Sequence, residues 1–71
     1  MKVEVFKTNI VDSLIANSFV FELMLLFPSA QINFDLDDCD KILRIKTESI
    51  CVKTIQRLFS EKGKWCELLD D

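Results

Sequence analysis

Histidine is absent from this 71-residue sequence, and glycine and proline occur only once each. Without histidine, the chain lacks the commonest metal ligand and the commonest general base at neutral pH. A single glycine and a single proline in a sequence with 49% hydrophobic residues exclude a flexible linker, a collagenous chain and a disordered tail. The sequence contains no glycine-rich phosphate loop, and its serines have no histidine to activate them. We therefore expect a folded domain that is not an enzyme and has no catalytic residues.

An excess of basic charge is also missing. The nine basic and 12 acidic residues give a formal net charge of −3. Proteins that bind nucleic acids usually present a basic surface to the phosphate backbone, so we expect no nucleic-acid partner. The length predicts one domain over residues 1–71. Because a domain of this size buries only about 60% of its unfolded surface, it has little room for an enclosed active site.

No hydrophobic run is long enough to suggest a membrane segment. The longest apolar stretch covers residues 19–27 and is interrupted by Glu22, whereas a membrane-spanning helix needs about 20 apolar residues. The first seven residues alternate in polarity and lack the continuous apolar segment of a signal peptide. We expect a soluble, cytoplasmic protein without a membrane partner.

The first part of the sequence predicts a strand followed by a helix. Residues 2–8 alternate and are rich in β-branched side chains, which is typical of a strand. Asp12 or Ser13 can supply the N-cap oxygen of a helix over residues 13–27. This helix should end at Pro28, because proline disfavours the helical conformation in the residue before it.

The second part predicts a hairpin, a second helix and a last strand. Residues 32–36 repeat apolar side chains with period two, an acidic turn follows, and residues 41–46 are again strand-like. Ser49 can cap a helix that is closed by Gly63. Residues 65–69 are expected to form the last strand.

This element order predicts an α+β, ferredoxin-like β-α-β-β-α-β sandwich: a four-stranded antiparallel sheet in the order 4-1-3-2, with two helices on one face. Phe6, Ile42 and Trp65 are expected to form a small apolar patch on the open face of the sheet. The expected core consists of Val3, Val5, Val20, Phe27, Ile32, Phe34, Leu43, Ile45, Ile55, Phe59 and Leu68.

Residues 26–36, LFPSAQINFDL, and residues 61–68, EKGKWCEL, are similar to two patterns of the heavy-metal-associated (HMA) domain family. This is the small fold of copper chaperones and of modules in metal-exporting ATPases. The family's metal loop, G-M-x-C-x-x-C, would place its cysteines near Ser13 and Ala16, and neither is a cysteine. Lys64 matches a lysine that some copper chaperones carry near this loop. The resemblance thus implies the fold without the usual metal site.

The three cysteines, Cys39, Cys51 and Cys66, form no Cys-x-x-Cys pair and are expected to be reduced thiols. In the predicted sheet, Cys39 and Cys66 lie on opposite edges, roughly 14 Å apart. This separation is too large for a disulfide. We expect Cys66 to be buried and Cys39, on a turn, to be the only reactive thiol.

We expect no metal ion or other cofactor. The alternative is an atypical metal-binding or metal-chaperone protein that holds a copper or zinc ion in the hairpin turn. The candidate ligands are Cys39, Asp37, Asp38 and Asp40.

The helix predicted over residues 13–27 is apolar around almost its whole circumference. The arc expected to face the sheet holds Ala16, Val20, Leu23, Met24 and Phe27. The opposite side and its flank hold Leu14, Phe19, Phe21, Leu25 and Leu26. A contiguous apolar stripe of this kind is typical of a partner surface. We therefore predict a non-catalytic protein-interaction or dimerisation module, which binds another protein or a second copy of itself through this stripe.

Overall fold

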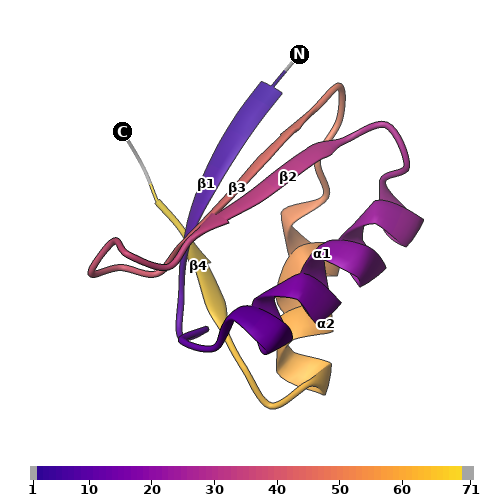
Figure 1. Ribbon diagram of the computed structural model, residues 1–71. Coiled ribbons are helices and arrows are strands. Elements are labelled where there is room, and N and C mark those ends of the chain that lie inside the picture. The colour runs from indigo at the N-terminus through magenta and orange to yellow at the C-terminus, as the bar shows by residue number, and fades with distance from the viewer. Residues whose placement is uncertain (1, 70–71) are drawn as a thin grey trace.

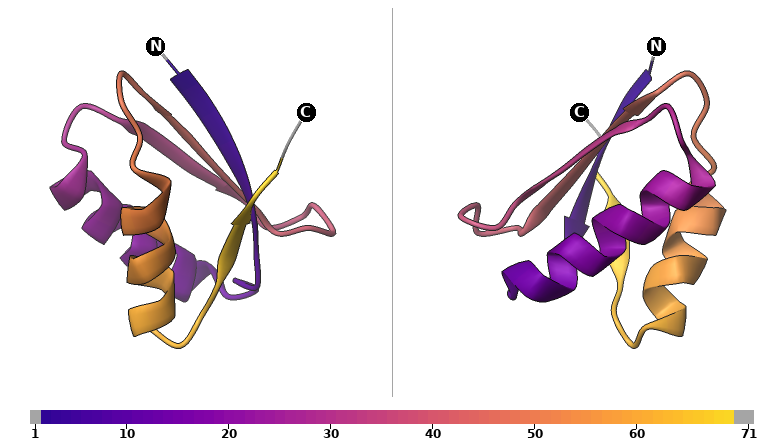
Figure 2. Two further views of the ribbon diagram at one scale, coloured as in Figure 1. Left: turned by 180° about the vertical axis from the view of Figure 1, so that it is seen from behind. Right: turned by 45° about the vertical axis from the view of Figure 1, so that its right-hand side comes forward.

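The computed structural model describes residues 2–69, so residues 1, 70 and 71 of the predicted domain lie outside the described range. Its four strands form one antiparallel sheet in the order β2-β3-β1-β4, and both helices lie on the same side of it (Figure 1; Figure 2). The fold is therefore α+β and consistent with the predicted ferredoxin-like arrangement. In chain order, the elements are β1 (Lys2–Thr8), α1 (Ser13–Leu26), β2 (Gln31–Asp35), β3 (Ile42–Thr47), α2 (Val52–Glu61) and β4 (Cys66–Leu68).

The helix starts follow local capping chemistry. Asp12 is the N-cap of α1, and its Oδ1 accepts a hydrogen bond of 2.8 Å from the backbone N–H of Leu14. The helix stops just before Pro28, as predicted. For α2, the N-cap is Cys51, so the prediction that Ser49 caps this helix was wrong.

The end of α2 is set by a glycine. Gly63 has φ 75°, in the left-handed region that side chains disfavour. Its N–H donates to the carbonyl of Ser60 at 3.0 Å, and the N–H of Lys64 donates to the carbonyl of Phe59 at 2.9 Å. These two bonds make a Schellman motif, which confirms that the helix closes at this glycine.

Thr8 joins the end of β1 to the loop that precedes β3. Its side chain is buried, and its Oγ1 donates to the carbonyl of Lys41 at 2.6 Å and accepts from the N–H of Ile10 at 3.1 Å. Lys41 has φ 49°, and its Nζ donates to the carbonyl of Leu36 at 2.8 Å. These bonds hold the β2–β3 hairpin turn against the end of β1.

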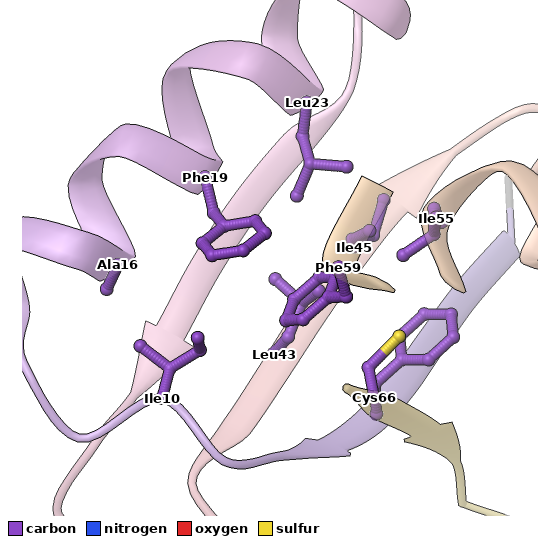
Figure 3. Packing of buried hydrophobic residues seen from close by; sticks show 10 residues of the cluster. Ile10, Ala16, Phe19, Leu23, Leu43, Ile45, Ile55, Phe59 and Cys66 are labelled. Carbon is purple, nitrogen blue, oxygen red and sulfur yellow. The ribbon is translucent and has the colours of Figure 1, made fainter. Parts of the chain in front are cut away.

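The core lies between the sheet and the two helices (Figure 3). Four of the residues predicted for the core are fully buried: Leu43, Ile45, Ile55 and Phe59. Others pack against the core while remaining partly exposed: Phe27, Ile32, Phe34 and Leu68. The buried cluster also contains Phe6, Ile10, Ala16, Phe19, Leu23 and Cys66.

Strand β1 has the opposite phase to the one predicted. Val3 is 51% exposed and Val5 is only half-buried, whereas Phe6 is fully buried opposite Leu43. Because alternate residues of a strand face opposite sides, burying Phe6 turns both valines toward the open face. Phenylalanine removes more apolar surface from water than valine does, so its burial determines the orientation.

This phase also removes the predicted patch of Phe6, Ile42 and Trp65, because Phe6 lies on the helix side of the sheet. Ile42 faces away from the helices, in register with Lys7, and is itself buried. Trp65 remains about half exposed, and its backbone N–H donates to Asn9 Oδ1 at 3.0 Å.

Candidate functional site

The buried side of α1 is rotated from the predicted one toward α2. Ala16, Phe19 and Leu23 are buried (Figure 3). Met24 is about half exposed. The ring of Phe19 stacks on Phe59 of α2, with the ring centroids 4.3 Å apart and the planes at 24°. Phe19 is therefore a core residue and does not belong to the predicted interaction stripe. The buried side differs from the predicted one because α1 packs against α2 as well as against the sheet.

On the opposite side, α1 exposes a row of large apolar side chains. Leu14 is 76% exposed, Phe21 66% and Leu25 67%. Their spacing of seven and four residues places them on one side of a helix. We call Leu14, Phe21, Met24 and Leu25 the α1 outer face. Leu26, also from the predicted stripe, is about half exposed and lies toward the α2 side.

The α1 outer face carries no charge. Glu22 is the one charged residue of α1, and it pairs with Lys62 at the end of α2. The Lys62 Nζ also lies 5.7 Å from the centroid of the Phe19 ring, so this charge pair sits on the α2 side of the helix. Both charged side chains are about one-third exposed, so the pair contributes at most about 1 kcal/mol to folding. A partner can thus cover the outer face without desolvating a charged group of α1.

A groove of about 310 Å³ runs between α1 and the edge strand β2, next to the outer face. This groove could not be predicted from the sequence, because two separate segments form its walls. Within the sequence of α1, the small side chains on one side of the helix were the only local indication of a groove. The lining residues are Ser13, Ala16, Asn17 and Val20 from α1, and Ile32, Asn33, Phe34 and Leu36 from the region of β2.

The hairpin turn brings three of the four alternative metal ligands together. Ligand atoms of Asp38, Cys39 and Asp40 lie within 4.8 Å of one another, and Asp37 does not belong to this group. Asp38 Oδ1 already accepts from the N–H of Asp40 at 2.8 Å, and Asp40 Oδ1 lies 3.8 Å from Lys7 Nζ. One thiol with two carboxylates suits zinc better than Cu(I), which prefers several soft sulfur ligands. A structural zinc site also needs a fourth ligand.

The two positions at which the HMA pattern would place its metal-binding cysteines lie in the first turn of α1. Ser13 is the first residue of the helix, and Ala16 is buried in the core. A hydroxyl and a methyl group cannot replace two thiolates as Cu(I) ligands. Lys64 is half-buried just after Gly63, where its N–H takes part in the helix-closing bonds.

The cysteines differ in their environments. Cys39 and Cys51 are exposed and Cys66 is buried, so two thiols are accessible, whereas only Cys39 was predicted to be reactive. The Thr54 hydroxyl donates to Cys51 Sγ at 3.1 Å and lowers the pKa of this thiol. Burial raises the pKa of the Cys66 thiol to about 11.

Comparison of the chain with protein-family models, with curated proteins and with solved structures finds no match. Within residues 2–69, no helix is both long enough and apolar enough to cross a bilayer.

Proposed function

We propose that this chain is a small, non-catalytic protein-interaction module that docks onto another protein chain through the α1 outer face. The observation that carries the proposal is the row of Leu14, Phe21 and Leu25, each about two-thirds or more exposed on an uncharged side of the helix. Single exposed apolar residues are ordinary in folded proteins, whereas contiguous patches are typical of binding surfaces.

The energetics support a docking role for these side chains. Fully burying a large apolar side chain is worth roughly 1.5–3 kcal/mol, and these three already leave most of their surface in water. They contribute little to the core, so the fold itself does not require them to be apolar. Their burial by a partner supplies a driving force that the isolated domain does not use.

The similarity to HMA domains fits this proposal. The element order is the one the resemblance implies, while the positions of the metal-binding cysteines hold Ser13 and Ala16. We propose a domain of HMA-like architecture that acts through protein contact rather than through metal transfer.

Affinity capture with matched baits tests the proposal. The baits are the wild-type chain, Phe21→Glu, Leu25→Glu and the control Gln56→Glu, which places the same charge at an exposed position of α2. We expect the wild type and Gln56→Glu to retain the same partner, and both α1 variants to lose it. Circular dichroism of all four baits shows whether the fold is kept. Equal retention of the partner on all four folded baits would contradict the proposal.

The second candidate is an atypical metal-binding protein that uses the hairpin turn. The proximity of Asp38, Cys39 and Asp40 favours it. It predicts stoichiometric binding of zinc that is lost in Cys39→Ser, whereas the interaction proposal predicts that Cys39→Ser leaves the docking activity unchanged. Anaerobic metal titration of both chains separates the two candidates.

A further inference from the structure

The groove beside the α1 outer face is large enough to take an aromatic ring. Its volume is about 310 Å³, and Ala16, Val20, Ile32 and Phe34 supply apolar walls. An apolar cavity of about 150 Å³ already accommodates benzene. The groove borders β2, whose outer edge has no neighbouring strand within residues 2–69. An incoming side chain can therefore reach the groove from the edge of the sheet.

The side chains of α1 are distributed unevenly along its length. On the side toward the groove, the first half of the helix carries small residues, including Ser13 and Asn17. Next to the groove, the outer face carries Phe21 and Leu25 in the second half of the helix and Leu14 near its start, all mostly exposed. The middle of α1 lies between Phe19 and Val20, so a two-fold axis there places Phe21 of each copy beside Ser18 and Asn17 of the other. The same axis places Leu25 beside Leu14 and Ser13 of the other. Each Phe21 ring then meets small polar side chains next to the groove, while Leu25 packs on Leu14 of the other copy at both ends of the contact.

We infer that the groove between α1 and β2 receives Phe21 of a second copy of this chain, in a symmetric dimer with antiparallel α1 helices. The inference rests on the proposed function, because it names the partner of the same outer face. It adds a receptor site to that face: each copy inserts one ring and accepts one ring. A two-fold contact of this kind closes on itself and stops at the dimer.

The exposed area fits a weak but specific dimer. A large side chain offers on the order of 200 Å² when fully exposed, so the four residues of the outer face expose on the order of 500 Å² per copy. Two copies together bury about 1,000 Å², before the groove walls are counted. This total reaches the lower limit for specific interfaces.

The charge distribution also favours a second copy. In a symmetric contact, a charge on the face that meets no opposite charge of the other copy is buried unpaired, which costs free energy. The outer face avoids this cost, because Glu22 lies toward α2 and is paired with Lys62. The acidic hairpin turns do not oppose the contact, because an antiparallel arrangement of the helices separates them.

Sedimentation velocity from low to high micromolar concentration, combined with isotope-filtered NMR, tests this inference. Phe21→Glu removes the inserted ring, and Gln56→Glu is its charge-matched control. Asn17→Trp fills the groove, and Asn17→Ala is its control because it leaves the groove open. In a sample of mixed labelled and unlabelled copies, we expect intermolecular contacts from the Phe21 ring to the methyl groups of Ala16 and Val20.

We expect the wild type and both controls to dimerise, and Phe21→Glu and Asn17→Trp to weaken the dimer by roughly 30-fold or more. A dimer that tolerates Asn17→Trp and shows none of these intermolecular contacts would overturn the inference. If that dimer were still lost in Phe21→Glu, the proposed docking face would stand. A wild type that stays monomeric at high micromolar concentration would also overturn the inference, while the capture experiment decides the proposed function independently.

Discussion

The stack of Phe19 on Phe59 fixes the rotation of α1 about its own axis. The two ring centroids lie 4.3 Å apart, and both side chains are fully or almost fully buried. Two residues along a helix correspond to a rotation of about 200°. With Phe19 turned toward α2, Phe21 therefore points away from the body of the domain. Two phenylalanines separated by one residue thus have opposite roles, one in the core and one on the outer face.

Replacing each of these phenylalanines by alanine should have very different effects on stability. Phe19→Ala leaves a cavity against Phe59 and should lower the free energy of unfolding by about 3–5 kcal/mol. A domain of this size has only a few kcal/mol of stability, so this variant should be largely unfolded. Phe21→Ala should change stability by no more than about 0.5 kcal/mol. Urea denaturation followed by circular dichroism measures both, and equal losses would show that the outer face is part of the core.

The thiols should react at different rates. At neutral pH, Cys51 should be alkylated by iodoacetamide faster than Cys66, because it is exposed and its hydrogen bond from Thr54 lowers the thiol pKa. Thr54→Val should slow the alkylation of Cys51 without changing the rate at Cys39. Mass spectrometry of the labelled peptides gives the rates. Native Cys66 reacting as fast as Cys51, or an unchanged Cys51 rate in Thr54→Val, would contradict this assignment.

Stability should decline at high pH because of Cys66. Burial raises the pKa of this thiol from its ordinary value of 9.0 to about 11, so the native state holds the proton more tightly than the unfolded state. The contribution of the protonated Cys66 thiol to the free energy of unfolding is complete below pH 9. It is lost as the pH rises from 9 to 11. The loss should be on the order of 2 kcal/mol. Urea denaturation across this range should show a shallower decline in Cys66→Ala, and the same decline in both proteins would refute the assignment.

The chain should bind Cu(I) no more tightly than small-molecule thiols do. Within residues 2–69, no group of three or more potential ligands contains two cysteines, and Cu(I) favours several sulfur ligands. Anaerobic titration in the presence of a competing chelator measures the affinity. A stoichiometric copper complex that survives the chelator and disappears in Cys39→Ser would overturn this prediction.

The element order could be predicted from the sequence because it depends on local chemistry. The side chain of Asp12, the restriction imposed by Pro28 and the left-handed conformation of Gly63 act within a few residues of the helix ends they define. Alternation of apolar residues was sufficient to locate the strands. The order of these elements then restricted the topology to few alternatives.

The orientation of β1 and of α1 could not be predicted in the same way. Strand β1 carries apolar residues on both faces, and burial of Phe6 rather than the two valines depends on its contact with Leu43, far along the chain. The rotation of α1 depends on α2, through Phe19 and Phe59. The exposure of Leu14, Phe21 and Leu25 was predicted correctly, because these residues lie opposite either possible buried arc. Their role as a docking face stays a prediction.

Hydroxyl-radical footprinting tests the central claim most directly, because it reports on the exposure of individual side chains whatever the partner is. The purified chain at low concentration is compared with the same chain in a concentrated extract of the cells that produce it. We predict that Phe21, Met24 and Leu25 are oxidised in the dilute sample and protected in the extract. Trp65, which is also about half exposed, should be oxidised to the same extent in both samples. Equal oxidation of the α1 outer face in the two samples would contradict the account.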